Sequence, residues 1–213
     1  MSPKRGGAKA LISKQLLAQT SLDIEGDIRN KLQYAIGFQL NQKSINGSGT
    51  APIPRGILNT AGIPTVAVGA NGGAPTKALM REFITKHKEN NAMSLNTPAY
   101  FLTPGLESFL SDLEKVSGYP RYVLEDGFIE GYAAVASNFL PNNLTKGTGT
   151  ALNAAIFGDF SGVYLGNWAG LDIVVDPITR ADFGELKITV NSYWDVAVPQ
   201  PNKLVIAKDF DIA

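Results

Sequence analysis

The sequence contains no cysteine in its 213 residues and only one histidine, His87. Disulfide bonds and thiolate metal sites are therefore excluded, and a metal site on His87 would need other ligands. Lys plus Arg equals Asp plus Glu at 19 each, so the overall charge favours neither nucleic acid nor an anionic membrane. No apolar run approaches the roughly 18 residues of a membrane-spanning helix, and the basic residues 1–5 precede no apolar signal core.

What the sequence does contain is turn residues and one long amphipathic segment. Glycine occurs 22 times and proline 12 times, which indicates many turns between short elements. The length suffices for one sizeable core or for two closely joined subdomains.

A helix is predicted from about Ser21 to Ile45. Its apolar residues recur every four positions and form one stripe, and Glu25 and Asp27 each precede a basic residue by four positions. The pattern Thr20–Asp23 fits an N-terminal capping motif, and Gly47 can end the helix. The stripe consists of Ile24, Ile28, Leu32, Ile36 and Leu40.

The clearest strand pattern lies near the C-terminus. Apolar or small residues occupy the even positions from Leu186 to Val198, whereas polar residues occupy most odd ones. This alternation predicts a long strand buried on one face, with Lys203–Ala207 returning as its partner. Shorter elements are predicted between: helices at Thr76–Asn90 and Pro104–Ser117, and a buried strand at Ala99–Leu102.

Several segments, taken in order and spacing, resemble the major capsid proteins of tailed phages of the Hong Kong 97 type. One departure is Ala133, which stands where the family commonly has proline. The segments that carry the resemblance are Pro3–Ala8, Ile12–Leu17, the long helix, Asn46–Gly49, Pro54–Asn59, Gly131–Pro141 and Phe157–Gly166.

The resemblance implies an α+β fold, with a long spine helix packed on an antiparallel sheet (the peripheral domain) and a mixed α/β axial domain. It assigns residues 1–60 to the end of an extended loop, the spine helix and the following loop. Residues 61–170 would form mainly the axial domain, and residues 171–213 would return to the peripheral domain.

The function implied is that of a structural coat protein, not an enzyme, which assembles into the pentamers and hexamers of an icosahedral shell around DNA. Its partners would be other copies of itself, with scaffold, protease and portal proteins as further candidates, and neither sequence-specific nucleic acid nor a membrane. It would reside in the virion capsid and, before assembly, in the bacterial cytoplasm. Two alternatives stay open: an encapsulin-like compartment shell, and a small soluble enzyme, which shifted pKa values in a pocket would favour.

The family's N-terminal arm and most of its extended loop have no counterpart before residue 1. We therefore expect this chain, taken alone, to be a monomer or a small oligomer, because those segments wrap neighbouring subunits. A trimmed piece, a processed product and a decayed prophage gene would all give such a start.

No catalytic, cofactor-binding or metal-binding residue is assigned from the sequence. The loops at Gly47–Thr50 and Lys146–Thr150 lack the full phosphate-loop motif, and the second is expected to be a flexible loop. His87, between two lysines, is expected to be a partly exposed surface residue. Asp23, Glu25 and Asp27 are explained by the helix dipole rather than by acid–base chemistry.

Two further expectations concern contacts between copies. The basic residues at the start are expected to meet acidic surfaces of neighbours: Lys4, Arg5, Lys9 and Lys14. Some members of the family cross-link their subunits covalently through a lysine, an asparagine and a glutamate. The resemblance places the asparagine position near Leu186 and the glutamate position near Tyr193, neither of which can do this chemistry. Asn191 lies in the wrong phase, so no autocatalytic cross-link is expected.

Overall fold

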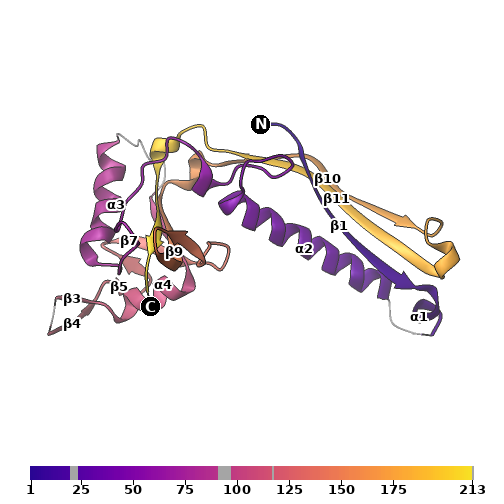
Figure 1. The fold of residues 1–213 in the computed structure, drawn as a ribbon, viewed down its shortest axis with the longest axis horizontal. Helices are drawn as coiled ribbons and strands as arrows, with labels where there is room; N and C mark the ends of the chain where they lie inside the picture. The colour runs from indigo at the N-terminus through magenta and orange to yellow at the C-terminus, as the bar shows by residue number, and fades with distance from the viewer. Residues whose placement is uncertain (20–23, 91–96, 117, 213) are drawn as a thin grey trace. The chain divides into compact units, whose positions relative to one another are not determined.

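The structure is a computed structural model that describes residues 1–19, 24–90, 97–116 and 118–212 (Figure 1). The fold is α+β, and the chain forms two compact units, each built from two separated stretches. The first unit comprises Met1–Ile57 and Leu165–Ala197, and the second comprises Leu58–Tyr164 and Val198–Ala213.

The first unit is a three-stranded sheet with a long helix along one face. The strand order is β1-β11-β10, and β1 runs antiparallel to β11 from Lys4 opposite Trp194 to Ser13 opposite Glu185. In Figure 1 the helix α2 runs beside these strands. The elements are β1 (Lys4–Ser13), α1 (Lys14–Gln19), α2 (Ile24–Asn46), β10 (Tyr164–Asp176), the 3-10 turn η3 (Ala181–Phe183) and β11 (Glu185–Ala197).

The predicted stripe of α2 faces this sheet. Leu32 and Ile36 are buried against Ile12, Ile188 and Val190, with the other apolar residues of the stripe half-buried. The expected i,i+4 ion pairs form between Glu25 and Arg29 and between Asp27 and Lys31. The helix is described from Ile24, so the predicted cap at Thr20–Asp23 lies outside the described residues.

The strand β11 confirms the predicted alternation, with its even residues buried from Leu186 to Val196. The predicted partner is wrong. Lys203 ends a 3-10 turn, and Leu204–Ala207 belong to β12 (Leu204–Phe210), which pairs with β9 (Gly149–Gly158) in the second unit, whereas β11 lies between β1 and β10. The reason is burial: Leu204–Ala207 are all buried, which suits a strand covered on both faces rather than a half-exposed sheet. Residues 198–213 therefore join the second unit.

The second unit is built on a seven-stranded sheet. The strand order is β12-β9-β2-β7-β6-β5, with β8 also paired to β9. Its elements are η1 (Ile57–Asn59), α3 (Lys77–Glu89), β2 (Ala99–Leu102), α4 (Pro104–Asp112), β3 (Glu114–Val116), β4 (Tyr119–Tyr122), β5 (Leu124–Glu125), β6 (Phe128–Ile129), β7 (Tyr132–Ala136), β8 (Leu144–Lys146), β9 (Gly149–Gly158), η2 (Phe160–Gly162), η4 (Pro201–Lys203) and β12 (Leu204–Phe210).

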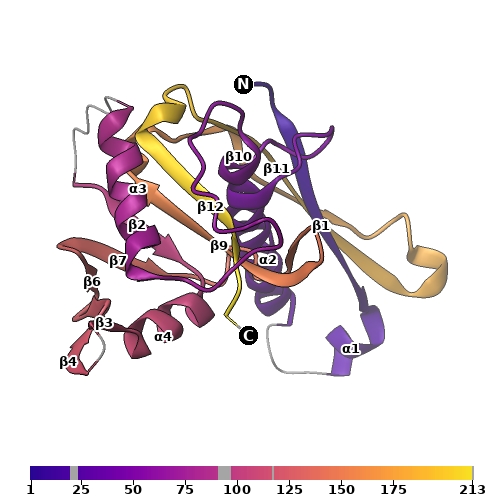
Figure 2. The same cartoon turned by 60° about the vertical axis from the view of Figure 1, so that its left-hand side comes forward.

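The core of the second unit is aromatic. Phe83 of α3 contacts Tyr100 and Phe210, and Tyr100 packs on Phe157, with 4.4 Å between the two ring centroids. The Tyr100 hydroxyl donates to the Met80 carbonyl at 2.7 Å, so its burial leaves no polar atom unpaired. The helix α3 packs against β9 and β12 (Figure 2).

Both helices of the second unit begin at the predicted residues. The hydroxyls of Thr76 and Thr103 each accept from the backbone N–H three residues on, at 3.3 Å. The helix α4 ends at Asp112, not at Ser117 as predicted, because Glu114–Val116 forms β3, which pairs with β4.

Candidate functional site

The expectation that His87 is a partly exposed surface residue is wrong. His87 is 5% exposed, and its ring packs edge-on against Phe157, with 5.4 Å between centroids. Burial lowers the pKa of His87, and the charge of Asp159 opposes this only in part. The imidazole is therefore neutral and part of the core. The flanking lysines suggested an exposed position, but they lie on other faces of α3 than His87.

The two glycine-rich loops are structural turns. At Gly47, an added Cβ would overlap the carbonyl oxygens of Lys43 and Pro54, so only glycine permits this close approach. The stretch from Lys146 to Thr150, expected to be a flexible loop, is instead a tight connection between β8 and β9, and Gly147 there has φ +58°. The Thr148 N–H donates to Asn71 Oδ1 at 3.2 Å, which holds the turn in place.

Two of the four basic residues at the start bind within their own unit. The Lys4 ammonium lies 3.3 Å from the Asp195 carboxylate, which also accepts from the Ser2 N–H at 2.8 Å. Arg5 donates twice to Asn191 Oδ1, at 3.0 and 2.8 Å. Lys4 and Arg5 thus secure β1 to β11, whereas Lys9 is exposed.

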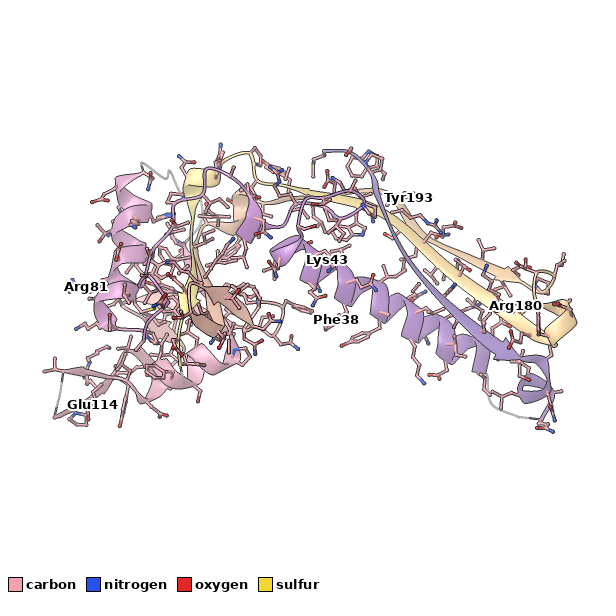
Figure 3. The ribbon with its side chains drawn as sticks, in the orientation of Figure 1. Phe38, Lys43, Arg81, Glu114, Arg180 and Tyr193 are labelled. Carbon is pink, nitrogen blue, oxygen red and sulfur yellow. The ribbon has the colours of Figure 1, made fainter. Side chains whose placement is uncertain are left out.

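The positions considered for cross-linking chemistry lie on opposite faces of β11. Leu186 is buried towards α2, whereas Tyr193 is 38% exposed and projects from the other face (Figure 3). Asn191, besides its bonds to Arg5, donates to Asp172 at 3.4 Å. The Asn191 amide is therefore held by charged side chains on both neighbouring strands.

Within residues 1–19, 24–90, 97–116 and 118–212, no group of three His, Asp or Glu side chains could hold a metal ion. Within the same residues, no helix combines the length and apolarity needed to cross a membrane.

The first unit exposes several large apolar side chains on its edge strand β10 and in the following loop. Trp168 is 48% exposed and Ile178 80% exposed. The loop itself is ordered: the Asp176 carboxylate accepts from the N–H groups of Ile178 and Thr179 and from the Thr179 hydroxyl, which lowers the pKa of Asp176 to about 2. Arg180 lies in the same loop (Figure 3). The exposed apolar side chains of this segment are Leu165, Trp168, Leu171, Val174, Ile178 and Phe183.

The second unit has a groove of about 620 Å³ that is lined in part by β12, and we call it the β12 groove. It is lined by residues 58–63, 65–67, 144–146 and 206–209. Much of its lining is apolar, and its ionisable side chains are Lys146, Lys208 and Asp209.

Asp209 is the buried acid of this groove, at 3% exposure. Its Oδ2 accepts from the Lys146 ammonium at 2.6 Å and from the Val68 N–H at 3.0 Å. Its Oδ1 is buried and has no hydrogen-bond partner among the described residues. Lys208 donates to Asn59 Oδ1 at 3.1 Å, and burial lowers the pKa of Lys208. Sequence patterns had given no sign of this cluster, because its members are up to 150 positions apart.

A spine helix on one sheet together with a second α+β unit is the fold of shell-forming proteins of the Hong Kong 97 type. The profile of the phage capsid family matches residues 1–209, and the chain belongs to that family.

The relatives agree with this assignment. The chain is 25% identical over 210 residues to the major capsid protein of Halomonas phage phiHAP-1, a match that covers 98% of this chain but spans about a third (32%) of that relative. The capsid of a native GTA particle superposes with a TM-score of 0.78 at 16% identity, over 98% of this chain and 73% of that one. The structure from Gordonia phage Cozz gives 0.70 at 20% identity, over 97% and 70%.

The fold also resembles an encapsulin, the holo-SrpI complex of Synechococcus elongatus. The TM-score is 0.65 at 17% identity, over 99% of this chain and 75% of that one. Identity at this level shows a shared fold alone. The family profile and the curated relative both favour the phage capsid reading over the encapsulin alternative.

Proposed function

We propose that this chain forms the shell-building part of a major capsid protein, which assembles through its surfaces into pentamers and hexamers of an icosahedral phage shell enclosing DNA. Residues 1–60 and 171–197 would act as the peripheral domain and residues 61–170 mainly as the axial domain. The protein would be free in the host cytoplasm before assembly and in the virion capsid afterwards.

The observation that carries this proposal is the set of exposed large apolar side chains on β10 and the loop after it, from Leu165 to Phe183. Such a density of exposed apolar side chains on one segment is typical of contact surfaces between proteins. The strand β10 is also an edge strand of its sheet, where unpaired backbone groups favour association with another chain. Membership of the phage capsid family makes further copies of the same protein the natural occupant.

The function proposed involves no catalysis, cofactor or metal. Lys146 and Asp209, the charged pair in the β12 groove, form an ion pair within the fold rather than an acid–base pair. Scaffold, protease and portal proteins would be partners during assembly, whereas specific nucleic-acid sequences and membranes would not.

Assembly can be tested by light scattering and negative-stain microscopy on this chain and on the gene product that contains it. Pentamers, hexamers or closed shells are expected from the gene product. Trp168→Lys should prevent them, because it places an unpaired charge in an apolar contact, whereas Gln39→Lys, on an exposed position of α2, should not. A gene product that stays monomeric at high concentration would contradict the proposal.

A further inference from the structure

The β12 groove offers one cation and an apolar lining. Lys146 is committed to Asp209 Oδ2, so the groove retains the positive charge of Lys208, which donates to the neutral Asn59 amide oxygen at 3.1 Å. Much of the remaining lining is apolar. An occupant that supplies a carboxylate and an apolar side chain would match both features of the groove.

The opposite edge of the same sheet carries such a group. The strands β5 and β6 form a hairpin in which Glu125 pairs with Phe128 around Asp126-Gly127. Asp126 and Gly127 have φ of +52° and +78°, the positive values that a two-residue type I′ turn requires. The Gly127 carbonyl accepts from the Ala134 N–H at 2.8 Å, so this tip, residues 125–128, is fixed to β7.

The side chains of the tip are available for contact. Phe128 is 52% exposed, and Asp126 is exposed with no ion pair or hydrogen bond among the described residues. Its acidic neighbours are already neutralised: Glu125 pairs with Lys115 at 3.2 Å and Glu130 with Lys77 at 3.8 Å. The tip therefore presents one net negative charge beside one large apolar ring.

The β12 groove and the β5–β6 tip lie at opposite ends of one sheet, an arrangement that suits a ring of identical subunits. A ring needs a heterologous interface, in which two different surfaces of each copy meet. The strands β12 and β5 are the two ends of the seven-stranded sheet, and the two surfaces have opposite charge.

We propose that the β5–β6 tip of one copy docks into the β12 groove of a second copy, with Asp126 pairing with Lys208 and Phe128 covering the apolar lining. Repetition of this contact closes a ring of second units. The inference rests on the proposed function, since it assigns the contact within the pentamers and hexamers.

Charge exchange tests the pair directly in the assembling gene product. Asp126→Lys and Lys208→Asp should each raise the protein concentration needed for ring formation about tenfold, because each places like charges together. The double variant should return to within about threefold of the natural protein. The matched control Asp112→Lys changes another exposed acid of the second unit and should leave the concentration unchanged. Unchanged assembly in both single variants would overturn the inference.

Thiol cross-linking gives a second measurement, since the chain has no cysteine of its own. With Asp126→Cys and Lys208→Cys in one chain, a short bifunctional thiol reagent should join assembled copies into a ladder that ends at the ring size. The pair Asp112→Cys with Lys208→Cys should give no ladder. Rings or shells in the microscope without a ladder would overturn this contact while leaving the proposed function intact. Absence of any assembly would overturn both.

Discussion

The ammonium of Lys146 lies 2.6 Å from Asp209 Oδ2, joining the β8–β9 connection to the strand β12 across 63 positions of sequence. The carboxylate is 4% exposed and the lysine side chain 40% exposed. The acid therefore depends on this cation for its burial, whereas the lysine has access to water.

Lys146→Met should lower the free energy of unfolding of the second unit by about 2 kcal/mol, because it leaves a buried carboxylate without its counter-charge. The expected loss is smaller than for a fully buried pair because the lysine is partly exposed to water. Urea denaturation followed by circular dichroism measures the loss, and hydrogen exchange locates it at β12. Lys77→Met removes a longer pair, at 3.8 Å to Glu130, and should cost less than about 0.5 kcal/mol. Equal losses in both variants would contradict the assignment.

His87 should make the second unit sensitive to acid. The folded chain lowers the pKa of His87 from 6.5, mainly through burial, with Asp159 opposing and Lys88 adding to the effect. Between the two pKa values, His87 is protonated in the unfolded chain but not in the folded one. The free energy of unfolding is therefore highest above about pH 6.5 and decreases as the pH falls from there to the pKa of the folded state. The melting temperature should drop between pH 7 and pH 5. In His87→Phe this part of the pH dependence should vanish, and its persistence would show another group at work.

Gly56 should tolerate no side chain. An added Cβ would lie 2.5 Å from the Ile45 carbonyl oxygen and would also overlap the backbone of Gly47, so Gly56→Ala must displace the end of α2. We expect a loss of about 3 kcal/mol in the first unit, the cost typical of forced overpacking. Trp168 and Trp194, the only tryptophans, both belong to this unit, so tryptophan fluorescence reports its unfolding alone.

Gly37→Ala is the matched control for this variant. Gly37 lies inside α2 with open space around its Cβ position, so alanine there should add about 0.5–1 kcal/mol of stability. A destabilised Gly37→Ala would show that the helix face is more crowded than the structure has it.

Assembled particles should contain no covalent bonds between chains. The resemblance places the family's asparagine position near the apolar Leu186, and Asn191 is already bound by Arg5 and Asp172. Particles boiled in detergent should run as single chains in gel electrophoresis. A ladder of oligomers would contradict this prediction, and mass spectrometry of the ladder would identify the residues joined.

The sequence predicted the elements that rest on local periodicity. The four-residue repeat in α2 and the two-residue alternation in β11 each reveal which face is buried, because burial acts on side chains at the period of the backbone. The threonine caps of α3 and α4 were predictable for the same reason: the hydroxyl bonds a group three residues away. The overall fold was predicted from the resemblance to the capsid family.

Only the tertiary structure decided which elements meet. Alternation in β11 indicated a half-buried strand but not that β1 and β10, rather than β12, lie beside it, since backbone hydrogen bonds are alike for every partner. The burial of His87, the pairing of Lys146 with Asp209 and the unmet oxygen in the β12 groove arise from segments distant in sequence. Short-range patterns fix the local backbone and the buried faces, while long-range packing determines which polar groups are brought together and which surfaces are left for other copies.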